Sequence, residues 1–423
     1  MHKVTRSSLY NIFGYLYILA ASFVAIPIIL KGIGKDAFGV YLLFAGLIPV
    51  ASSLDLGIAS SVVRNLSRQD IDSVRKQKIH QAGLMFFLIM GVGVSLAAGM
   101  FVYYLGLRIE AVRLLGNTHY YALLIASIIL INTIAQHFLS VVQAFHRFDY
   151  YNVRALIVGT ATTLVSAWVA GRTHSLPAML LSQLVFYLLA LVFLVRVSRR
   201  LIERKTLLPY FHKQEWRLLV GFGLKQFLGQ VVERIKQYFS KYYVGSRIAA
   251  SSVAVYGIPQ SITYNVLGLV SQVGVAAFPF SSEMESVKNS KRIGRLFWKA
   301  ETVVVLLALL QVILVWVWGW DFLAWWLDDS SLATSAYVIW RIYSTILVLA
   351  ATTPIPAFLM SGMGVPQVPS AFAAISTLIQ ISLIVMWTQR MGIMGVVYAE
   401  LVANLVTAPL FVLSFLRFLR RKR

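Results

Sequence analysis

Long apolar runs recur along the whole sequence, each about 18 to 28 residues long. A helix needs about 20 apolar residues to cross a bilayer, so each run predicts one transmembrane helix. Only 13% of the 423 residues are charged, whereas about a quarter are charged in a soluble domain. We therefore predict an all-α polytopic membrane protein with about 12 transmembrane helices. The predicted spans are Leu9–Leu30, Phe38–Val63, Ile79–Leu105, Tyr120–Phe145, Val153–Ala170, Leu176–Val197, Leu218–Tyr243, Val253–Phe280, Leu296–Trp318, Ala333–Met360, Val368–Thr388 and Met391–Phe418.

The positions of lysine and arginine between these runs predict the orientation of the chain. With the N-terminus inside, about 26 Lys and Arg fall in inside segments and about 8 in outside segments. This asymmetry is the positive-inside pattern, so we expect both termini to be cytoplasmic. The same clustering accounts for the formal net charge of +22, and we expect no nucleic-acid partner.

The longest polar break between runs, Arg196 to Arg217, divides the predicted spans into two sets of six. The two halves also share a weak repeat, because Phe13–Gly14 opens the first run and Phe222–Gly223 opens the seventh. Two six-helix lobes with both termini inside suit a transporter built around a central cavity. We expect the lobes to cover 1–200 and 218–423, with a cytoplasmic linker at 201–217.

The seventh run is the most highly charged of the predicted spans. On a helical wheel one half is polar and mostly cationic, and the other half is apolar. A spanning helix of this kind must turn its charged face toward water or protein, because a bare charge in hydrocarbon costs several kcal/mol. The alternative is an amphipathic helix on the cytoplasmic surface. The charged residues are Lys225, Glu233, Arg234, Lys236 and Lys241.

Four further charged residues lie within apolar runs, and each allows a structural or a functional interpretation. Asp55 either caps a helix break near Gly57 or serves a coupling ion. Arg341 either reaches outward from the tenth span or lines a cavity. Glu400 is either a protonatable carboxylate or a partner for a cavity arginine. Glu301 is expected to pair with a cytoplasmic cation such as Lys299 or Arg295.

Enzyme chemistry has no support in the sequence. The chain has no cysteine, its seven histidines show no metal-ligand spacing, and it has no phosphate-binding loop of the Walker type. We therefore expect neither catalysis nor a bound metal or cofactor.

Several stretches resemble one known family. They are NIFGYLYILAASFVAIPIILKGIGKDAFGVYLL with SSLDLGIASSVVRNLSR in the first half, and VGFGLKQFLGQVVERIKQYFSKYYVG, AVYGIPQSI and GMGVPQVPSAF in the second. The chain thereby resembles the Wzx-type O-antigen and polysaccharide flippases of the multidrug/oligosaccharidyl-lipid/polysaccharide (MOP) exporter superfamily. The resemblance implies two lobes of six helices, alternating access, and location in the bacterial cytoplasmic (inner) membrane. It also implies a substrate, an undecaprenyl-diphosphate-linked oligosaccharide, that moves from the cytoplasmic to the periplasmic leaflet.

A cationic cavity would hold the diphosphate of such a substrate. We expect Lys225, Arg234, Lys236 and Arg341 to attract the anion, with Glu233 orienting one of the cations. Asp55 and Glu400 are the candidates for coupling to H⁺ or Na⁺. A polysaccharide polymerase and a chain-length regulator are the expected protein partners. The alternatives are a cation-coupled multidrug exporter of the same superfamily and a membrane polysaccharide polymerase or acyltransferase.

Overall fold

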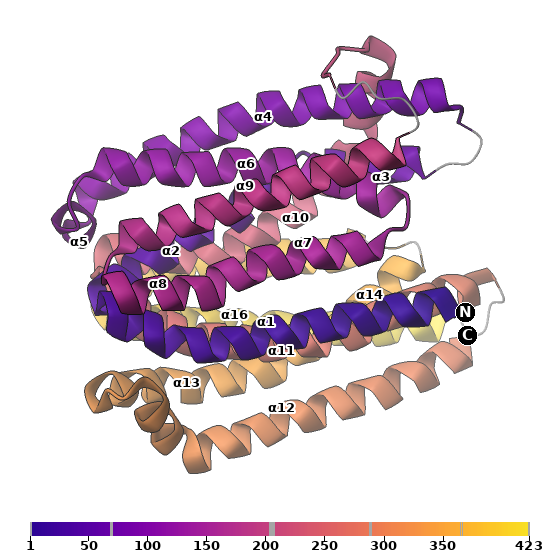
Figure 1. Ribbon diagram of the computed structural model, residues 1–423. Helices are drawn as coiled ribbons and strands as arrows, with labels where there is room; N and C mark the ends of the chain where they lie inside the picture. The colour runs from indigo at the N-terminus through magenta and orange to yellow at the C-terminus, as the bar shows by residue number, and fades with distance from the viewer. Residues whose placement is uncertain are drawn as a thin grey trace. The chain divides into compact units, whose positions relative to one another are not determined.

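The computed structural model describes residues 2–67, 71–202, 208–286, 290–363, 365 and 367–421. Within these ranges, side chains are described except at 2–15, 221–231, 233, 270–286, 290–293, 296, 362 and 421. The described residues form helices joined by short connections, with no strand among them. Figure 1 shows the helices as long rods, as the apolar runs predict.

The helices fall in the order of the predicted spans, several of which are interrupted. Those of the first six spans are α1 (His2–Ile33), α2 (Lys35–Ser53), α3 (Ile58–Leu66), α4 (Ser73–Arg108), α5 (Glu110–Leu114), α6 (Thr118–Ala144), α7 (Phe148–Thr160), the π-helix η1 (Ala161–Val165), α8 (Ser166–Thr173) and α9 (Leu176–Leu201). Those of the second six are α10 (Lys213–Arg247), α11 (Ala250–Ser286), α12 (Ser290–Leu327), α13 (Ser330–Ala351), α14 (Pro354–Gly362), α15 (Gln367–Met391) and α16 (Ile393–Arg421).

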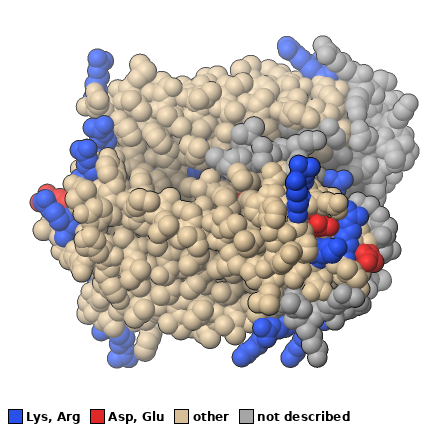
Figure 2. Space-filling view, turned by 90° about the horizontal axis from the view of Figure 1, so that it is seen from above, with Lys and Arg blue, Asp and Glu red and all other residues tan. Residues whose placement is uncertain are grey.

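Ten stretches of the described chain are helical, long and apolar enough to cross a membrane. They correspond to ten of the twelve predicted spans, and the seventh and eighth runs form α10 and α11, of 35 and 37 residues. Helices of that length exceed the thickness of a bilayer. Most Lys and Arg visible in Figure 2 lie toward the two ends of the helices, with uncharged surface between them. The prediction of an all-α polytopic membrane protein is confirmed.

The chain divides into two compact units. The first covers Met1–Arg234 and Ala249–Ser251, and the second covers Ile235–Ile248 and Ser252–Arg423. The predicted linker at 201–217 includes residues 203–207, which lie outside the described residues. The predicted boundaries of the two lobes stay a prediction.

Within the first unit, α6 is the central element. It packs along α4 and α9, and α3 and α2 also contact it (Figure 1). Two clusters of buried side chains join these helices, one around Phe87 and Val141 and the other around Phe138 and Leu194. Lipid tails are as apolar as leucine, so such clusters stabilise a membrane protein by close packing rather than by removal from water.

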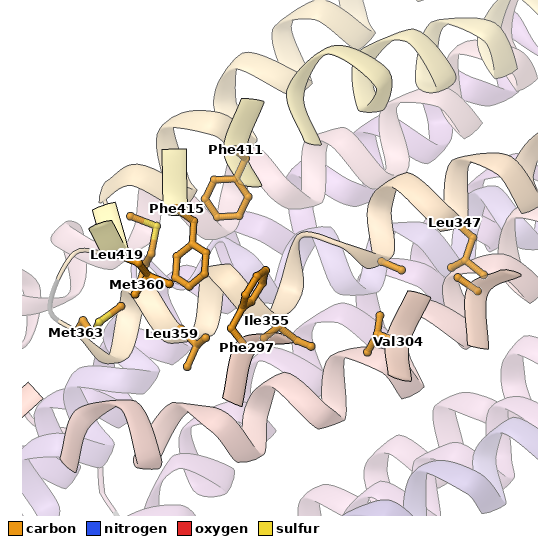
Figure 3. Close-up of a cluster of buried hydrophobic side chains, with 12 residues drawn as sticks. Phe297, Val304, Leu347, Ile355, Leu359, Met360, Met363, Phe411, Phe415 and Leu419 are labelled. Atoms are coloured by element: carbon orange, nitrogen blue, oxygen red, sulfur yellow. The ribbon is translucent and has the colours of Figure 1, made fainter. Parts of the chain in front are cut away.

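The second unit has its own core, drawn in Figure 3. Phe415 packs against Phe297 with ring centroids 4.9 Å apart, which joins α16 to α12. Side chains of α13 and α14 complete the cluster. The tenth span breaks between these two helices, at Thr352 and Thr353, directly before Pro354. Proline disfavours the helical conformation of the residue before it, which explains a break at this position.

The second span breaks between α2 and α3, where four residues leave the helical path. Leu56 and Gly57 both have positive φ, 53° and 71°, in the left-handed region. A leucine in this region is strained, so the surrounding contacts must hold the turn in place. The break includes Asp55, whose carboxylate accepts hydrogen bonds from backbone amides of this turn, as described below.

Candidate functional site

A buried carboxylate lies at the centre of the second unit. Glu400 on α16 is fully buried, and its two oxygens accept hydrogen bonds from tyrosine hydroxyls on two other helices. Tyr264 on α11 donates to Oε1 at 2.7 Å, and Tyr343 on α13 donates to Oε2 at 2.7 Å. The hydroxyl of Tyr256, eight residues before Tyr264 on α11, donates to Oε2 over a longer distance of 3.4 Å. The carboxylate therefore has a donor for each oxygen, as a buried acid requires.

We call Glu400 with Tyr256, Tyr264 and Tyr343 the Glu400 cluster. Two further residues, Gln260 and Lys241, interact with its members. The Nε2 atom of Gln260 donates to the Tyr256 hydroxyl at 2.9 Å. Lys241 on α10 interacts electrostatically with Glu400, and its ammonium lies 5.5 Å from the centre of the Tyr238 ring. A carboxylate and three phenols thus meet within the second unit of a membrane protein.

The cationic helix α10 is continuous from Lys213 to Arg247. The Nζ atom of Lys236 donates a 2.7 Å hydrogen bond to the hydroxyl of Ser376, which is buried on α15. Arg234 is exposed on the same helix. The side chains of Lys225 and Glu233 lie outside the described residues, so the predictions made for these two residues stay predictions.

Arg341 on α13 lies against two aromatic rings. Its guanidinium carbon lies 3.8 Å from the centre of the Trp316 ring, and 5.7 Å from that of Tyr337. The Tyr337 hydroxyl in turn donates to the Trp316 carbonyl at 3.3 Å. A guanidinium over an indole face is a favourable cation–π contact. The described neighbours of Arg341 are therefore aromatic.

Asp55 caps the helix that follows the break in the second span. Its Oδ1 accepts a hydrogen bond from the Gly57 amide at 3.0 Å, and its Oδ2 accepts one from the Ala59 amide at 3.0 Å. The first amides of a helix have no partner within the helix, so a side-chain acceptor here stabilises α3. Both carboxylate oxygens are used in this way, and the geometry is that of the capping alternative.

Two results differ from what the sequence suggested. Glu301 is buried on α12, but no ion pair joins it to Lys299 or Arg295, both of which are exposed. Arg154 is one of the approximately 26 Lys and Arg that the orientation count assigns to inside segments, as part of a cluster with Arg147. In the structure it lies inside α7 and donates to the buried Asn132. The sequence contains an indication of this position, because Arg154 is the second residue of a predicted span, Val153–Ala170, and does not precede it.

The fold defines the class of protein first. The chain has the fold of MOP-superfamily transporters. It superposes on a multidrug resistance MATE family transporter in its inward-facing conformation with a TM-score of 0.75 at 16% identity, covering 98% of this chain and 95% of that one. It superposes on the lipid II flippase MurJ, in an inward closed conformation, with a TM-score of 0.72 at 14% identity, covering 97% and 86%.

The sequence then places the chain within one family. The model of the polysaccharide biosynthesis protein family matches residues 4–285, so the chain belongs to that family. A Shigella flexneri protein named for O-antigen transport is 20% identical over 296 residues, which cover 69% of each chain. Family and fold are those of transporters rather than enzymes, which confirms that prediction and removes the polymerase and acyltransferase alternatives.

Proposed function

We propose that this protein is a flippase for an undecaprenyl-diphosphate-linked oligosaccharide, the repeat unit of O-antigen or a related surface polysaccharide. It moves this lipid from the cytoplasmic to the periplasmic leaflet of the bacterial inner membrane by alternating access. The polysaccharide family and the likeness to a lipid II flippase fold support a lipid-linked glycan as the cargo. The observation that carries the proposal is the charge of α10, a long helix in a membrane protein that bears Lys225, Arg234, Lys236 and Lys241.

The chemistry of the substrate explains this charge. A diphosphate and a hydrated glycan do not cross hydrocarbon unaided, because an unpaired charge there costs several kcal/mol. A helix face carrying ammonium and guanidinium groups offers the diphosphate charge-assisted hydrogen bonds. Lysine supplies a point charge and arginine a planar fork, so Lys225, Arg234 and Lys236 form a plausible phosphate-binding set. Glu233 keeps one of these cations oriented, and Arg341, held over Trp316, is the fourth member of the set.

Energy for directional transport comes, in this proposal, from a coupling ion that binds at the Glu400 cluster. A carboxylate buried among phenols binds a proton by neutralisation, or Na⁺ by coordination through its oxygens. Asp55 is the other proposed coupling residue. The donors to Asp55 are backbone amides of its own turn, whereas the donors to Glu400 are tyrosine side chains of two other helices. A change at Glu400 therefore reaches more of the fold, which makes it the stronger candidate of the two.

The second candidate function is a cation-coupled multidrug exporter. The likeness to a multidrug resistance transporter fold and the buried Glu400 favour it. An exporter of cationic drugs requires acidic groups that attract its cargo, whereas α10 is mostly basic. We therefore rank the flippase first.

The test is translocation of an undecaprenyl-diphosphate-linked oligosaccharide in proteoliposomes, together with complementation of a bacterial strain that lacks its O-antigen flippase. We expect Lys225→Ala, Arg234→Ala and Lys236→Ala each to reduce translocation at normal protein levels. Lys213→Ala is the matched control, since Lys213 is exposed at the start of the same helix and precedes the apolar run. Normal translocation by all three variants would exclude the cationic face as the substrate site. Export of a cationic dye, with no lipid translocation, would favour the multidrug exporter.

A further inference from the structure

Arg154 on α7 carries a positive charge into the first unit of the protein. Its Nη2 atom donates a 2.7 Å hydrogen bond to Oδ1 of Asn132 on α6. The Nδ2 atom of Asn132 donates to the hydroxyl of Ser52 on α2 at 2.9 Å. Asn132 is itself buried. Three helices thus fix the position of one guanidinium, and Asn132 is oriented by Ser52 so that its oxygen faces the arginine.

The hydrogen-bond partner of Arg154 lies farther than Arg154 itself from the turn between α6 and α7. Arg154 is six residues into α7, about 9 Å from the start at Phe148, at 1.5 Å per residue. Asn132 is twelve residues before the end of α6 at Ala144, about 18 Å from the same interhelical turn. An arginine near a helix end normally extends toward the polar headgroups. Here the side chain is held in the opposite direction, toward the middle of the membrane-spanning segment.

No acidic side chain in the described part of the chain is paired with this charge. Among the described residues Arg154 forms no ion pair, and both oxygens of Asp55, the acid closest in sequence to Ser52, accept from backbone amides. The residues that interact electrostatically with the guanidinium are two tyrosines, Tyr187 and Tyr151. The Nε atom of Arg154 is buried without a hydrogen-bond partner. A partly buried guanidinium whose described partners are neutral is unfavourable, and such residues in membrane proteins are functional-site candidates.

We propose that Arg154, positioned by Asn132 and Ser52, is an anion-binding residue that contacts a phosphate of the lipid-linked substrate. The proposal rests on the proposed flippase function, and it adds to α10 a second contact on another part of the chain. The arginine is only partly buried, and its donor groups outnumber the single hydrogen bond that it makes. A phosphate would supply the missing negative charge and accept the unused donors as a fork. Asn132 and Ser52 are positioning residues, since they act through Arg154.

The sharpest test replaces the neutral partner of the arginine by an acid of the same shape. Asn132→Asp places a carboxylate 2.7 Å from the guanidinium, which keeps Arg154 in place but neutralises it. Arg154→Gln removes the charge directly. Arg147→Gln is the control, because it makes the same charge change beside the same turn at a residue already paired with Asp149 at 2.7 Å. Each full-length variant is purified in nanodiscs, and binding of undecaprenyl diphosphate and the thermal unfolding temperature without ligand are measured.

We expect Asn132→Asp and Arg154→Gln to weaken binding of undecaprenyl diphosphate roughly ten- to hundred-fold, the loss typical of a hydrogen bond to a charged group. The control should bind as the wild type does, and Asn132→Asp should unfold at the wild-type temperature or above. Wild-type affinity in Asn132→Asp overturns the proposal, and it does so even if Arg154→Gln fails to fold. A structural role alone would lower the unfolding temperature of Arg154→Gln and leave binding by Asn132→Asp unchanged.

Two further probes separate this inference from the proposed function. Inorganic diphosphate tests the anion site without the lipid, and phosphatidylglycerol tests for a membrane headgroup as its occupant. Binding of inorganic diphosphate that depends on Arg154, without binding of the lipid diphosphate, supports the anion site and contradicts the flippase. Displacement of undecaprenyl diphosphate by an equal concentration of phosphatidylglycerol overturns the assignment of the ligand. If the wild type binds none of these probes, both proposals fail.

Discussion

Tyr343 on α13 donates a 2.7 Å hydrogen bond to Oε2 of Glu400 on α16, and both side chains are fully buried. The bond joins two helices through residues that are 57 positions apart in the chain. A second tyrosine, Tyr264, satisfies the other carboxylate oxygen from α11. The carboxylate is thus the point at which three helices of the second unit meet. Any change in its protonation or ligation alters the contacts of all three, which suits a residue that couples an ion to a change of conformation.

Tyr343→Phe should therefore destabilise the protein. The substitution removes the shorter of the two hydrogen bonds to Oε2 and leaves only Tyr256 at 3.4 Å, and loss of a hydrogen bond to a charged group costs about 1.5–3 kcal/mol. Thermal unfolding of the purified variant measures this effect. Tyr103→Phe on α4 is a suitable control, because Tyr103 is exposed and stacks on His119. Equal unfolding temperatures for Tyr343→Phe and the wild type would contradict the hydrogen bond.

Glu400→Gln should separate transport from its driving ion. The amide keeps the size of the side chain and accepts from one of the tyrosines, but it neither releases a proton nor supplies a carboxylate charge. Translocation is measured in proteoliposomes with an imposed proton or sodium gradient. We expect the wild type to respond to one of these gradients and Glu400→Gln to respond to neither. An unchanged gradient dependence in this variant would remove Glu400 from the coupling mechanism.

Asp55→Asn and Asp55→Ala should differ in stability. Asparagine caps helices about as well as aspartate, whereas loss of a capping side chain costs about 0.5–2 kcal/mol. Asp55 accepts from one backbone amide with each oxygen, so Asp55→Asn keeps one of the two hydrogen bonds and Asp55→Ala loses both. We therefore expect Asp55→Asn to retain transport with a small loss of stability and Asp55→Ala to lower the unfolding temperature further. The opposite pattern, a stable Asp55→Asn variant that has lost transport, would show that the charge of Asp55 is needed for coupling.

The stacking of Arg341 on Trp316 predicts a coupled pair of substitutions. Cation–π contacts contribute about 0.5–2 kcal/mol, so Arg341→Gln and Trp316→Leu should each destabilise by an amount of that order. If the contact accounts for both effects, the double variant loses less stability than the two single losses added together. A double-mutant cycle gives this difference, which is the interaction energy of the pair. An interaction energy of zero would mean that Arg341 is held by other groups.

The sequence predicts the helices well, because the apolar run that a bilayer requires is visible in one dimension. Glu400 is also conspicuous, since a carboxylate inside such a run is rare. Its partners Tyr264 and Tyr343 are not conspicuous, because tyrosine is common in the apolar runs of this chain. Their convergence depends on how α11, α13 and α16 pack against one another. The hydrophobic pattern of a single run does not predict which helices will be its neighbours.

The ends of the runs explain the residues that the sequence misplaced. Arg154 lies near the border of the fifth run, where the same residue is either an interfacial cation or an intramembrane one. Only the direction of its side chain, fixed by Asn132, decides between the two. Asp55 presents a similar ambiguity, since a helix cap and a coupling acid require the same side chain beside the same glycine.

Gly83→Ala tests the packing of α4 against α6, and Gly93→Ala on the same helix is its matched control. A β-carbon at Gly83 would lie 2.9 Å from Cε1 of His137 and 3.0 Å from Cγ2 of Val62, whereas a β-carbon at Gly93 would have nothing within 4 Å. His137 is not free to move away, because it is buried and its Nε2 atom is hydrogen-bonded to Nδ1 of His80 at 2.9 Å.

Overpacking of this kind costs about 1–3 kcal/mol, and alanine is otherwise favoured over glycine in a helix by about 1 kcal/mol. Gly83→Ala should therefore lower the unfolding temperature, and Gly93→Ala should leave it unchanged or raise it. If both variants unfold at the same temperature, α4 and α6 are not packed as closely at Gly83 as the structure shows. If Gly83→Ala alone is destabilised, a second substitution, His137→Ala, should relieve the overlap at Gly83 and make the effect of Gly83→Ala smaller in that background.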